Sequence, residues 1–241
     1  MTMRRDFISK PVLRAGDILT GQMTEMENVF GTHEGERCDK WQQYLPVYDR
    51  HLSKFRGTAV RFLEIGVANG GSFEIWRRYL GEQACLHGLD ISKSEEATKC
   101  LGSVQATLHI GDQKNKVLLR QIVAEMGGGI DVVIDDGSHV STDQIATFQL
   151  LYPLLSPDGV YICEDTHTSY FSSLRRPGTF VEFAKQKIDE IHSWYVDDSA
   201  RMSDAFALMT SSVLFYDSMV VFERAPAGKT EPRRIVVGRD P

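Results

Sequence analysis

The chain has 241 residues, with 33 acidic and 27 basic side chains, a formal net charge of −6 and an isoelectric point near 5.7. Nucleic-acid binding needs clustered lysine and arginine to displace counterions, so this acidic balance argues against a nucleic-acid partner. At 42% hydrophobic and 25% charged residues, the composition excludes disordered, collagen-like and coiled-coil classes. The length suits one large α/β domain with appended arms.

The sequence carries no sign of a membrane segment or a disulfide framework. No window approaches the roughly 18 apolar residues of a membrane span, and the N-terminus lacks an apolar run of signal-peptide length. The four cysteines are far apart and have no CxxC or zinc-ligand spacing, so we interpret them as free thiols. These features predict a soluble, cytoplasmic protein.

Residues 1–57 mix apolar and polar side chains without a strand pattern, and we expect them to form an N-terminal helical arm. Within it, KWQQYLPVYDRHL at 40–52 is typical of an aromatic-rich helix that Pro46 interrupts. The arm is expected to act as a substrate lid or an oligomer contact. Its aromatic side chains offer more apolar surface than a lone extension should expose, which favours a homo-oligomer.

A strand-then-helix pattern begins after the arm. Strands are predicted at 60–66, 85–92, 106–113, 130–136 and 159–165, and helices between them at 73–81, 93–102, 116–129 and 141–155. This alternation predicts an α/β fold in which a mostly parallel sheet has helices on both faces.

The end of the chain departs from this pattern. A further helix is predicted at 181–195, and residues 211–225 read as two strands around the turn Asp217-Ser218. We expect these strands to form an antiparallel C-terminal hairpin at the sheet edge. The predicted domain therefore covers residues 58–225, and residues 226–241 are a C-terminal tail.

Polar residues end nearly every predicted parallel strand. In an open α/β sheet, ligands bind at the carboxyl ends of the strands. Any one of these acids alone can be a helix N-cap. Together at one edge they indicate a ligand site, and they are Glu64, Gly66, Asp90, Asp112, Gln113, Asp135, Asp136, Glu164 and Asp165.

The turn after the first strand, EIGVANGGS, favours a particular class of cofactor. It departs from GxGxxG because Ala68 stands where the second glycine would allow close approach of a diphosphate. Asp90 lies 24 residues beyond Gly66, close to the spacing at which an acid accepts from ribose hydroxyls. A ribose-bearing cofactor without a diphosphate fits this pattern, and S-adenosylmethionine is such a cofactor.

Two adjacent predicted strands each end in a pair of acids. Asp135 and Asp136 end one strand, Glu164 and Asp165 end the next, and neighbouring strands lie roughly 5 Å apart. Like charges so close require protonation or a cation. Oxygen ligands suit hard divalent ions, which indicates Mg²⁺, with Ca²⁺ or Mn²⁺ as alternatives.

Histidines and aromatic residues near these acids are candidates for catalysis and substrate binding. His139 lies three residues after Asp136, where an imidazole can serve as a general base; a capping histidine is the alternative. His167 could take the same role or bind substrate. Tyr44 and Tyr170, with Trp41, could stack on a substrate, although aromatic residues in a helical stripe also serve packing.

The segments LEIGVANGGS, GLDIS, GDQ, DVVIDDGSH and EDTHTSY, in this order, resemble the metal-dependent sugar O-methyltransferases of antibiotic biosynthesis, including enzymes of the mycinamicin and tylosin type. The similarity runs from about residue 31 to residue 223. It implies a Rossmann-like class I methyltransferase fold and transfer of a methyl group from S-adenosylmethionine to a sugar hydroxyl of a glycosylated natural product.

The resemblance also implies roles for individual residues. Mg²⁺ would be held by Asp136, Glu164 and Asp165, and His139 would be the base. The residues implied around S-adenosylmethionine are Glu64, Gly66, Ser72, Asp90, Asp112, Gln113 and Asp135, with Gln113 near the adenine. The alternatives are action on a catechol, a hydroxylase-associated component acting on a cephalosporin-type molecule, and a non-catalytic partner subunit that binds S-adenosylmethionine.

Overall fold

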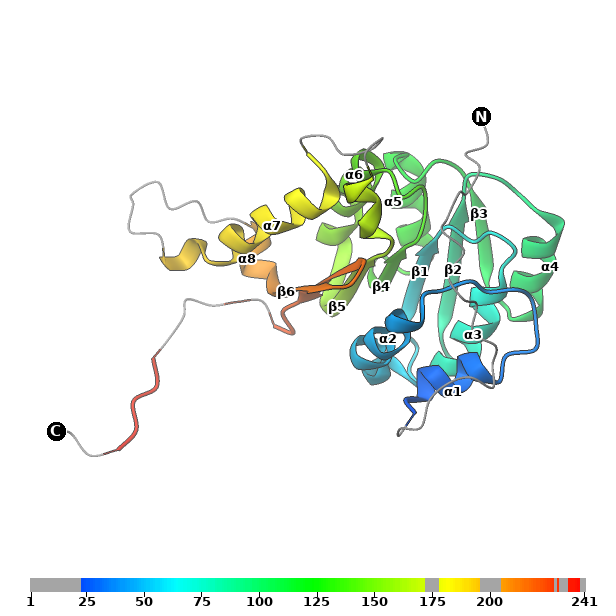
Figure 1. Ribbon diagram of the computed structural model, residues 1–241, viewed down its shortest axis with the longest axis horizontal. Coiled ribbons are helices and arrows are strands. Elements are labelled where there is room, and N and C mark those ends of the chain that lie inside the picture. Colours follow the sequence, from blue (N-terminus) through cyan, green and yellow to red (C-terminus); the bar gives the residue numbers. More distant parts are fainter. Residues whose placement is uncertain (1–22, 172–177, 196–204, 228, 230–233, 239–241) are drawn as a thin grey trace.

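The computed structural model describes residues 23–171, 178–195, 205–227, 229 and 234–238. Within these residues, seven strands form one sheet in the order β3-β2-β1-β4-β5-β7-β6 (Figure 1). Their bounds are β1 (Arg61–Ile65), β2 (Cys85–Asp90), β3 (Thr107–Ile110), β4 (Ile130–Asp135), β5 (Leu155–Cys163), β6 (Thr210–Tyr216) and β7 (Met219–Arg224).

The strand pairing confirms the predicted mixed sheet. Strands β1 to β5 pair in parallel, whereas β7 pairs antiparallel with both β5 and β6. The chain builds outward from β1 to β3 and then returns to the other side of β1 with β4. This reversal creates a crevice between the carboxyl ends of β1 and β4, where ligands bind in open α/β sheets.

Helices cover both faces of the sheet, as predicted (Figure 1). The α-helices are α1 (Glu25–Gly31), α2 (Leu45–Leu52), α3 (Gly71–Leu80), α4 (Glu95–Ser103), α5 (Lys116–Glu125), α6 (Ser141–Leu151), α7 (Phe180–Ile191) and α8 (Ala205–Met209). Short 3₁₀ turns are η2 (Gln42–Tyr44), η3 (Ser53–Phe55), η4 (Tyr152–Leu154), η5 (Thr166–Tyr170) and η6 (Ser193–Tyr195).

Two hydrophobic cores fill the spaces between the sheet and its helices. Successive strand residues face opposite sides, so Phe62 packs with α1 to α4 while Leu63 packs with α5 to α8. None of the helices in the described residues is long and apolar enough to cross a membrane.

The arm is built differently from the interrupted helix expected at 40–52. A 3₁₀ turn precedes α2, and Pro46 occupies the first turn of that helix. Proline is favourable there, because the amide protons of a first helical turn have no partner inside the helix. Pro46 therefore helps to begin α2 and does not interrupt it.

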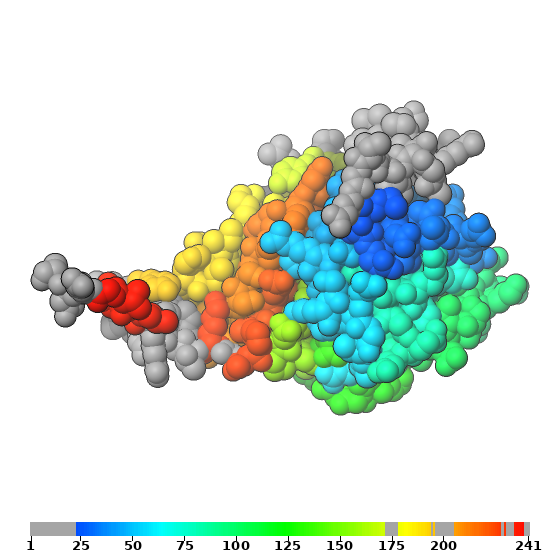
Figure 2. All heavy atoms as spheres, turned by 90° about the horizontal axis from the view of Figure 1, so that it is seen from below, coloured from blue at the N-terminus to red at the C-terminus, as the bar shows by residue number. Residues whose placement is uncertain are grey.

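The described part of the arm belongs to the core on its side of the sheet. Met26, Tyr44, Tyr48 and Leu52 are at most 1% exposed and pack in the same hydrophobic core as Phe62. Figure 2 shows α1 and α2 forming part of one face of the molecule. Residue 57 therefore does not separate two cores. At the other end of the chain, residues 234–238 project from the body of the protein (Figure 2).

Candidate functional site

The carboxyl ends of β1, β4 and β5 lie side by side. The amide of Asp136 donates to the carbonyl of Ile65 at 2.9 Å, and the amide of Glu164 donates to that of Asp135 at 3.0 Å. These bonds continue the pairing past the strand ends. The acid-bearing segments predicted to meet at one edge of the sheet do so.

Lys40 of the arm lies among the carboxylates at this edge. Its ammonium donates to Asp136 Oδ2 at 2.6 Å and Glu164 Oε2 at 2.9 Å, and approaches Glu64 Oε1 at 3.4 Å. The Lys40 side chain is only 4% exposed. Tyr48 donates to the other oxygen of Glu164 at 2.5 Å. Sequence reasoning missed Lys40, and no local pattern links it to an aspartate 96 residues away.

We call Glu64, Asp136, Glu164 and Asp165 the acidic cluster. Burial lowers the pKa of Lys40, but Asp136 and Glu164 outweigh it and hold that pKa well above its ordinary value. Burial raises the pKa of Glu164 to about 8 although Lys40 acts in the opposite direction. One ammonium therefore does not compensate the four carboxylates, and the cluster remains a site for further positive charge.

His139 faces the outer side of the acidic cluster. Its Nε2 lies 3.6 Å from Asp165 Oδ2 and 3.9 Å from Asp136 Oδ1. These three ligand atoms all lie within 4.8 Å of one another, as a shared metal ion would require. The buried Nδ1 of His139 has no hydrogen-bond partner among the described residues.

The backbone at this point is strained. His139 and Asp165 have φ values of +55° and +52°, in the left-handed region that residues other than glycine rarely adopt. Ala68, in the turn after β1, has a φ of +50°. Such strain costs of the order of 1–3 kcal/mol per residue and collects at functional sites.

Asp165 is oriented by the arm and by the turn between β6 and β7. The phenol of Tyr44 donates to Asp165 Oδ1 at 2.8 Å and also lies 2.9 Å from Ser218 Oγ. Tyr44 is 1% exposed, so its ring contacts the protein interior and not solvent. Burial, reinforced by Asp165, raises the pKa of Tyr44 far above its ordinary value, which keeps the phenol a proton donor.

The predicted cofactor residues of the first turn surround the end of β1. A Cβ on Gly66 would lie 2.1 Å from the carbonyl oxygen of Asp136, so only glycine fits between these segments. Asp90 at the end of β2 accepts from the amides of Val67 and Ala68 at 2.9 and 3.0 Å. These bonds fix the glycine turn against β2.

Glu64 and Ser72 form a buried pair behind this turn. Ser72 Oγ donates to Glu64 Oε2 at 2.6 Å, and Trp76 Nε1 donates to the same oxygen at 3.0 Å. With Lys40 on its other oxygen, Glu64 links the arm, β1 and α3.

Gln113 and Asp135 form a second buried group, between the ends of β3 and β4. Asp135 accepts from Tyr161 at 2.9 Å and from Gln113 Nε2 at 3.3 Å, so its side chain is directed away from Lys40. Burial raises the pKa of Asp135 to about 7. Gln113 Oε1 accepts from the amide of Ser138 at 2.9 Å. Asp112, beside this group, is half exposed to solvent.

Aromatic rings lie beside the acidic cluster on its outer side. The rings of Trp41 and His167 pack edge to face with centroids 6.0 Å apart, and the ring centroids of Phe171 and His167 are 5.3 Å apart. Tyr170 and Phe171 are 64% and 40% exposed, so they can contact a ligand without rearrangement. Of the aromatic residues predicted to contact substrate, Tyr170 is thus at the surface and Tyr44 is not.

The chain is similar to known methyltransferases. Residues 63–166 match the methyltransferase domain family. The chain is 33% identical over 202 residues to an 8-demethyl-8-alpha-L-rhamnosyl tetracenomycin-C 2'-O-methyltransferase of Streptomyces olivaceus, covering 77% of this chain and 52% of the relative. It is 35% identical over 187 residues to an L-olivosyl-oleandolide 3-O-methyltransferase of Streptomyces antibioticus, covering 70% and 47%.

A solved structure is similar as well. The MycE methyltransferase from the mycinamycin biosynthetic pathway, in complex with Mg, SAH and mycinamycin VI, superposes with a TM-score of 0.72 at 25% identity. The match covers 85% of this chain and 54% of that structure. The chain thus spans about half the length of the relatives it matches.

The sheet order and the acid-bearing strand ends define a class I methyltransferase fold. The chain belongs to this fold class, and residues 63–166 match the methyltransferase domain family. Within that class, its homologues are the sugar O-methyltransferases of macrolide and tetracenomycin biosynthesis, which confirms the resemblance found in the sequence.

Proposed function

We propose that this chain transfers a methyl group from S-adenosylmethionine to a sugar hydroxyl of a glycosylated natural product, in a reaction that requires Mg²⁺. The observation that carries the proposal is the convergence of Asp136, His139 and Asp165 next to the glycine turn at the end of β1. The proposal is supported by the relatives, which are named as O-methyltransferases of sugar-bearing antibiotics.

The donor set fits a hard divalent cation. Asp136 Oδ1 and Asp165 Oδ2 face the same space beside His139. Glu164 Oε2 already accepts from Lys40, but a carboxylate oxygen has a second lone pair that can face a cation. We therefore assign Mg²⁺ to Asp136, Glu164 and Asp165. A bound Mg²⁺ would orient the sugar hydroxyl and lower its pKa.

His139 takes the role of general base in this proposal. A neutral imidazole can accept the proton of a hydroxyl that lies within hydrogen-bonding reach. The flanking carboxylates of Asp136 and Asp165 would then stabilise the imidazolium that forms.

The remaining groups at the edge hold the cofactor and the substrate. Gly66 lets the backbone turn tightly after β1, and we assign Asp90, at the end of β2, to the ribose hydroxyls. Asp112 and Gln113 are assigned to the adenosine side, and Glu64, Ser72 and Asp135 support the turn from behind. On the substrate side, we assign His167 and the exposed Tyr170 to contacts with the sugar or its aglycone, while Tyr44 donates to Asp165.

Assembly and location complete the proposal. Apolar side chains remain exposed at Phe215 on the edge strand β6 and at Ile235, Val236 and Val237, and we propose that the chain forms a homo-oligomer. Size-exclusion chromatography with light scattering tests this; a monomer at micromolar concentration contradicts it.

A cytoplasmic location belongs to the same proposal, because S-adenosylmethionine is made and used inside cells.

The decisive experiment is a mass-spectrometric screen of candidate deoxysugar glycosides with S-adenosylmethionine and Mg²⁺. A gain of one methyl group on a sugar is expected, with activity lost in EDTA and restored by Mg²⁺.

Asp136→Asn is expected to abolish transfer while the affinity for S-adenosylmethionine stays within a few-fold. His139→Ala is expected to lower turnover by about 10² or more.

Two results would contradict this proposal. Full activity in EDTA would remove the metal from the reaction. Binding of S-adenosylmethionine without transfer to any sugar, catechol or cephalosporin-type acceptor would favour a non-catalytic partner subunit.

A further inference from the structure

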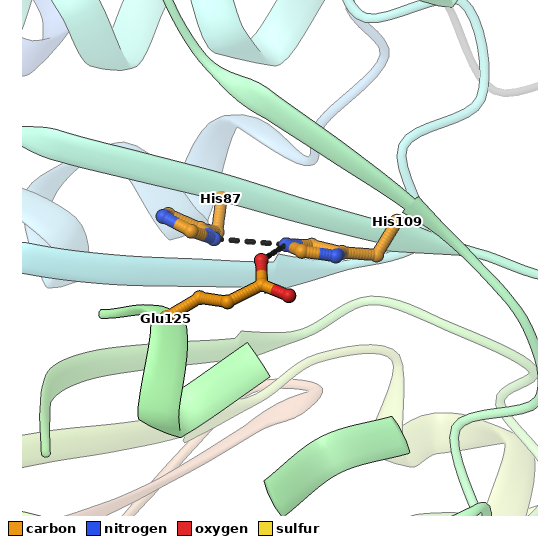
Figure 3. Close-up of side chains that lie close together, drawn as sticks. All are labelled: His87, His109 and Glu125. Atoms are coloured by element: carbon orange, nitrogen blue, oxygen red, sulfur yellow. Dashed lines mark hydrogen bonds and ion pairs between the residues drawn. The ribbon is translucent and has the colours of Figure 1, made fainter. Parts of the chain in front are cut away.

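A second group of metal-binding side chains lies away from the acidic cluster. His87 on β2, His109 on β3 and Glu125 at the end of α5 point toward one another on the α5 side of the sheet (Figure 3). His87 Nδ1, His109 Nε2 and a carboxylate oxygen of Glu125 all lie within 4.8 Å of one another. The proposed methyl transfer uses none of these residues.

The two imidazoles share a hydrogen bond. His87 Nδ1 and His109 Nε2 are 2.9 Å apart, the ring planes differ by 16° and the ring centroids are 5.1 Å apart. The two nitrogens therefore lie between the centroids and face each other. One of them carries a hydrogen and the other presents a lone pair. Only one proton can lie between the two rings, because two N–H groups that face each other would repel.

The spacing of the three ligand atoms is close to that of a tetrahedral metal site. Zn²⁺ binds imidazole nitrogen and carboxylate oxygen at about 2.0–2.2 Å, which places tetrahedral ligands about 3.3 Å apart. The two nitrogens, now 2.9 Å apart, would need to separate by about 0.4 Å. Glu125 Oε2, now 3.9 Å from His109 Nε2, would need to approach that nitrogen by about 0.6 Å. The carboxylate lies within 4.8 Å of His87 Nδ1 and would need to approach it further. Rotation of the two rings, whose facing nitrogens now point at each other, and of the exposed Glu125 side chain would bring the three atoms to these distances.

Charge and burial also favour a cation at this position. Burial lowers the pKa of His87 and of His109, so both rings are neutral and available as ligands near neutral pH. Glu125 is the last residue of α5, where the helix dipole is negative and no basic residue lies in the last turn. Its side chain is 59% exposed, which leaves room for water as a fourth ligand.

We propose that His87, His109 and Glu125 form a second metal site that binds a transition-metal ion such as Zn²⁺. Two imidazoles and a carboxylate suit Zn²⁺, Ni²⁺ or Cu²⁺ better than Mg²⁺, which prefers oxygen ligands. The ion would join β2, the edge strand β3 and α5. Asp90 ends β2 three residues beyond His87, about 10 Å along the strand, so the ion is structural and does not contact the cofactor edge.

Zn²⁺ titration of the metal-free protein tests this proposal. The acidic cluster could also bind Zn²⁺, so the titration uses an Asp136→Asn, Asp165→Asn background. In that background we expect one equivalent of Zn²⁺ to bind and to raise the melting temperature by several degrees, with no effect of millimolar Mg²⁺. Nitrogen NMR should show perturbation of Nδ1 of His87 and Nε2 of His109, the two nitrogens that face each other.

Three substitutions identify the ligands. His87→Gln and His109→Gln should abolish the Zn²⁺ response, and Glu125→Gln should weaken binding about tenfold or more. Because Glu125 is exposed, Glu125→Gln is expected to fold. Its matched control is Glu96→Gln on the surface of α4, which should bind Zn²⁺ like the background protein. The proposal is overturned if the background protein binds no Zn²⁺, or if Glu125→Gln and Glu96→Gln bind it equally well.

Discussion

At the scale of single residues, Lys40 is the group whose loss should be felt most. In Lys40→Met, the carboxylates of Glu64 and Glu164 would stay buried without their cation. Removing one partner of a buried ion pair costs about 3–5 kcal/mol, so we expect the free energy of unfolding in urea at pH 7 to fall by that amount. Added Mg²⁺ should recover part of the loss, because a divalent cation can replace the positive charge that the variant lacks beside Asp136.

Lys54→Met is the matched control for this substitution. Lys54 pairs with Asp158 at the surface, where ion pairs contribute about 1 kcal/mol or less. A Lys40→Met protein as stable as Lys54→Met in the absence of Mg²⁺ would show that the ammonium does not hold the acidic cluster together.

A second residue-scale prediction concerns Gly66. Its φ of +88° and the 2.1 Å approach of the Asp136 carbonyl to a built Cβ leave no room for a side chain. Gly66→Ala should lower the free energy of unfolding by about 2 kcal/mol or more and weaken binding of S-adenosylmethionine in calorimetry. Gly102→Ala in α4 is the control: nothing lies within 4 Å, and a helical alanine should raise stability by about 0.5–1 kcal/mol. Equal effects of the two changes would refute the steric argument.

At the scale of elements, α1 depends on its N-terminal cap. The amide of Glu27 donates to Thr24 Oγ1 at 3.2 Å, and the amide of Thr24 donates to the Glu27 carboxylate at 2.7 Å. Thr24→Ala should therefore lower the free energy of unfolding by about 1 kcal/mol in urea denaturation. Thr98→Ala, inside α4 and exposed, should change it by about 0.5 kcal/mol or less. A similar loss in both variants would mean that the cap is not the cause.

The elements also show where sequence patterns suffice. The spacing of apolar residues, together with the turn residues that bound each segment, predicts the order of strands and helices in the sheet. This works because each strand is a short apolar run between turn residues. The pattern predicts the fifth strand at 159–165, yet β5 begins at Leu155, four residues earlier. The reason is non-local: Leu155 pairs with Ile130, and a register shift in β4–β5 accommodates the extra residues. A single sequence window does not contain that pairing.

At the scale of the whole molecule, the sequence identified the acidic edge but not its internal partners. Parallel strands must end together, so Asp136 and Glu164 could be brought together from strand positions alone. The arm could not be placed in this way. Lys40 and Tyr44 reach the edge because the arm packs on the core, and strand positions do not predict that packing. Side-chain direction was equally hidden: Asp135, next to Asp136, is directed toward Tyr161 and away from Lys40.

The docking of the arm on the sheet should make the stability of the molecule sensitive to acid. His51 of α2 bonds to Glu223 of β7 at 2.8 Å, and with Ser212 it lowers the pKa of Glu223 from 4.5 to about 2 against the effect of burial. A depressed folded-state pKa contributes stability that is present above pH 4.5 and is lost as the pH falls toward 2.

Urea denaturation between pH 6 and pH 3.5 measures this linkage by comparing the wild type with Glu223→Gln. Because Glu223 is partly exposed, we expect its contribution to be about 1–2 kcal/mol. The wild type should be the more stable protein at pH 6. The difference should narrow steadily on acidification, because Glu223 of the unfolded chain takes up a proton near pH 4.5, whereas in the folded protein it does so only near pH 2. Arg61→Gln breaks the separate ion pair with Asp131 between β1 and β4. When both proteins carry Arg61→Gln, the difference made by Glu223→Gln should narrow with pH in the same way. A difference between wild type and Glu223→Gln that stays constant with pH would show that the arm is held by packing alone.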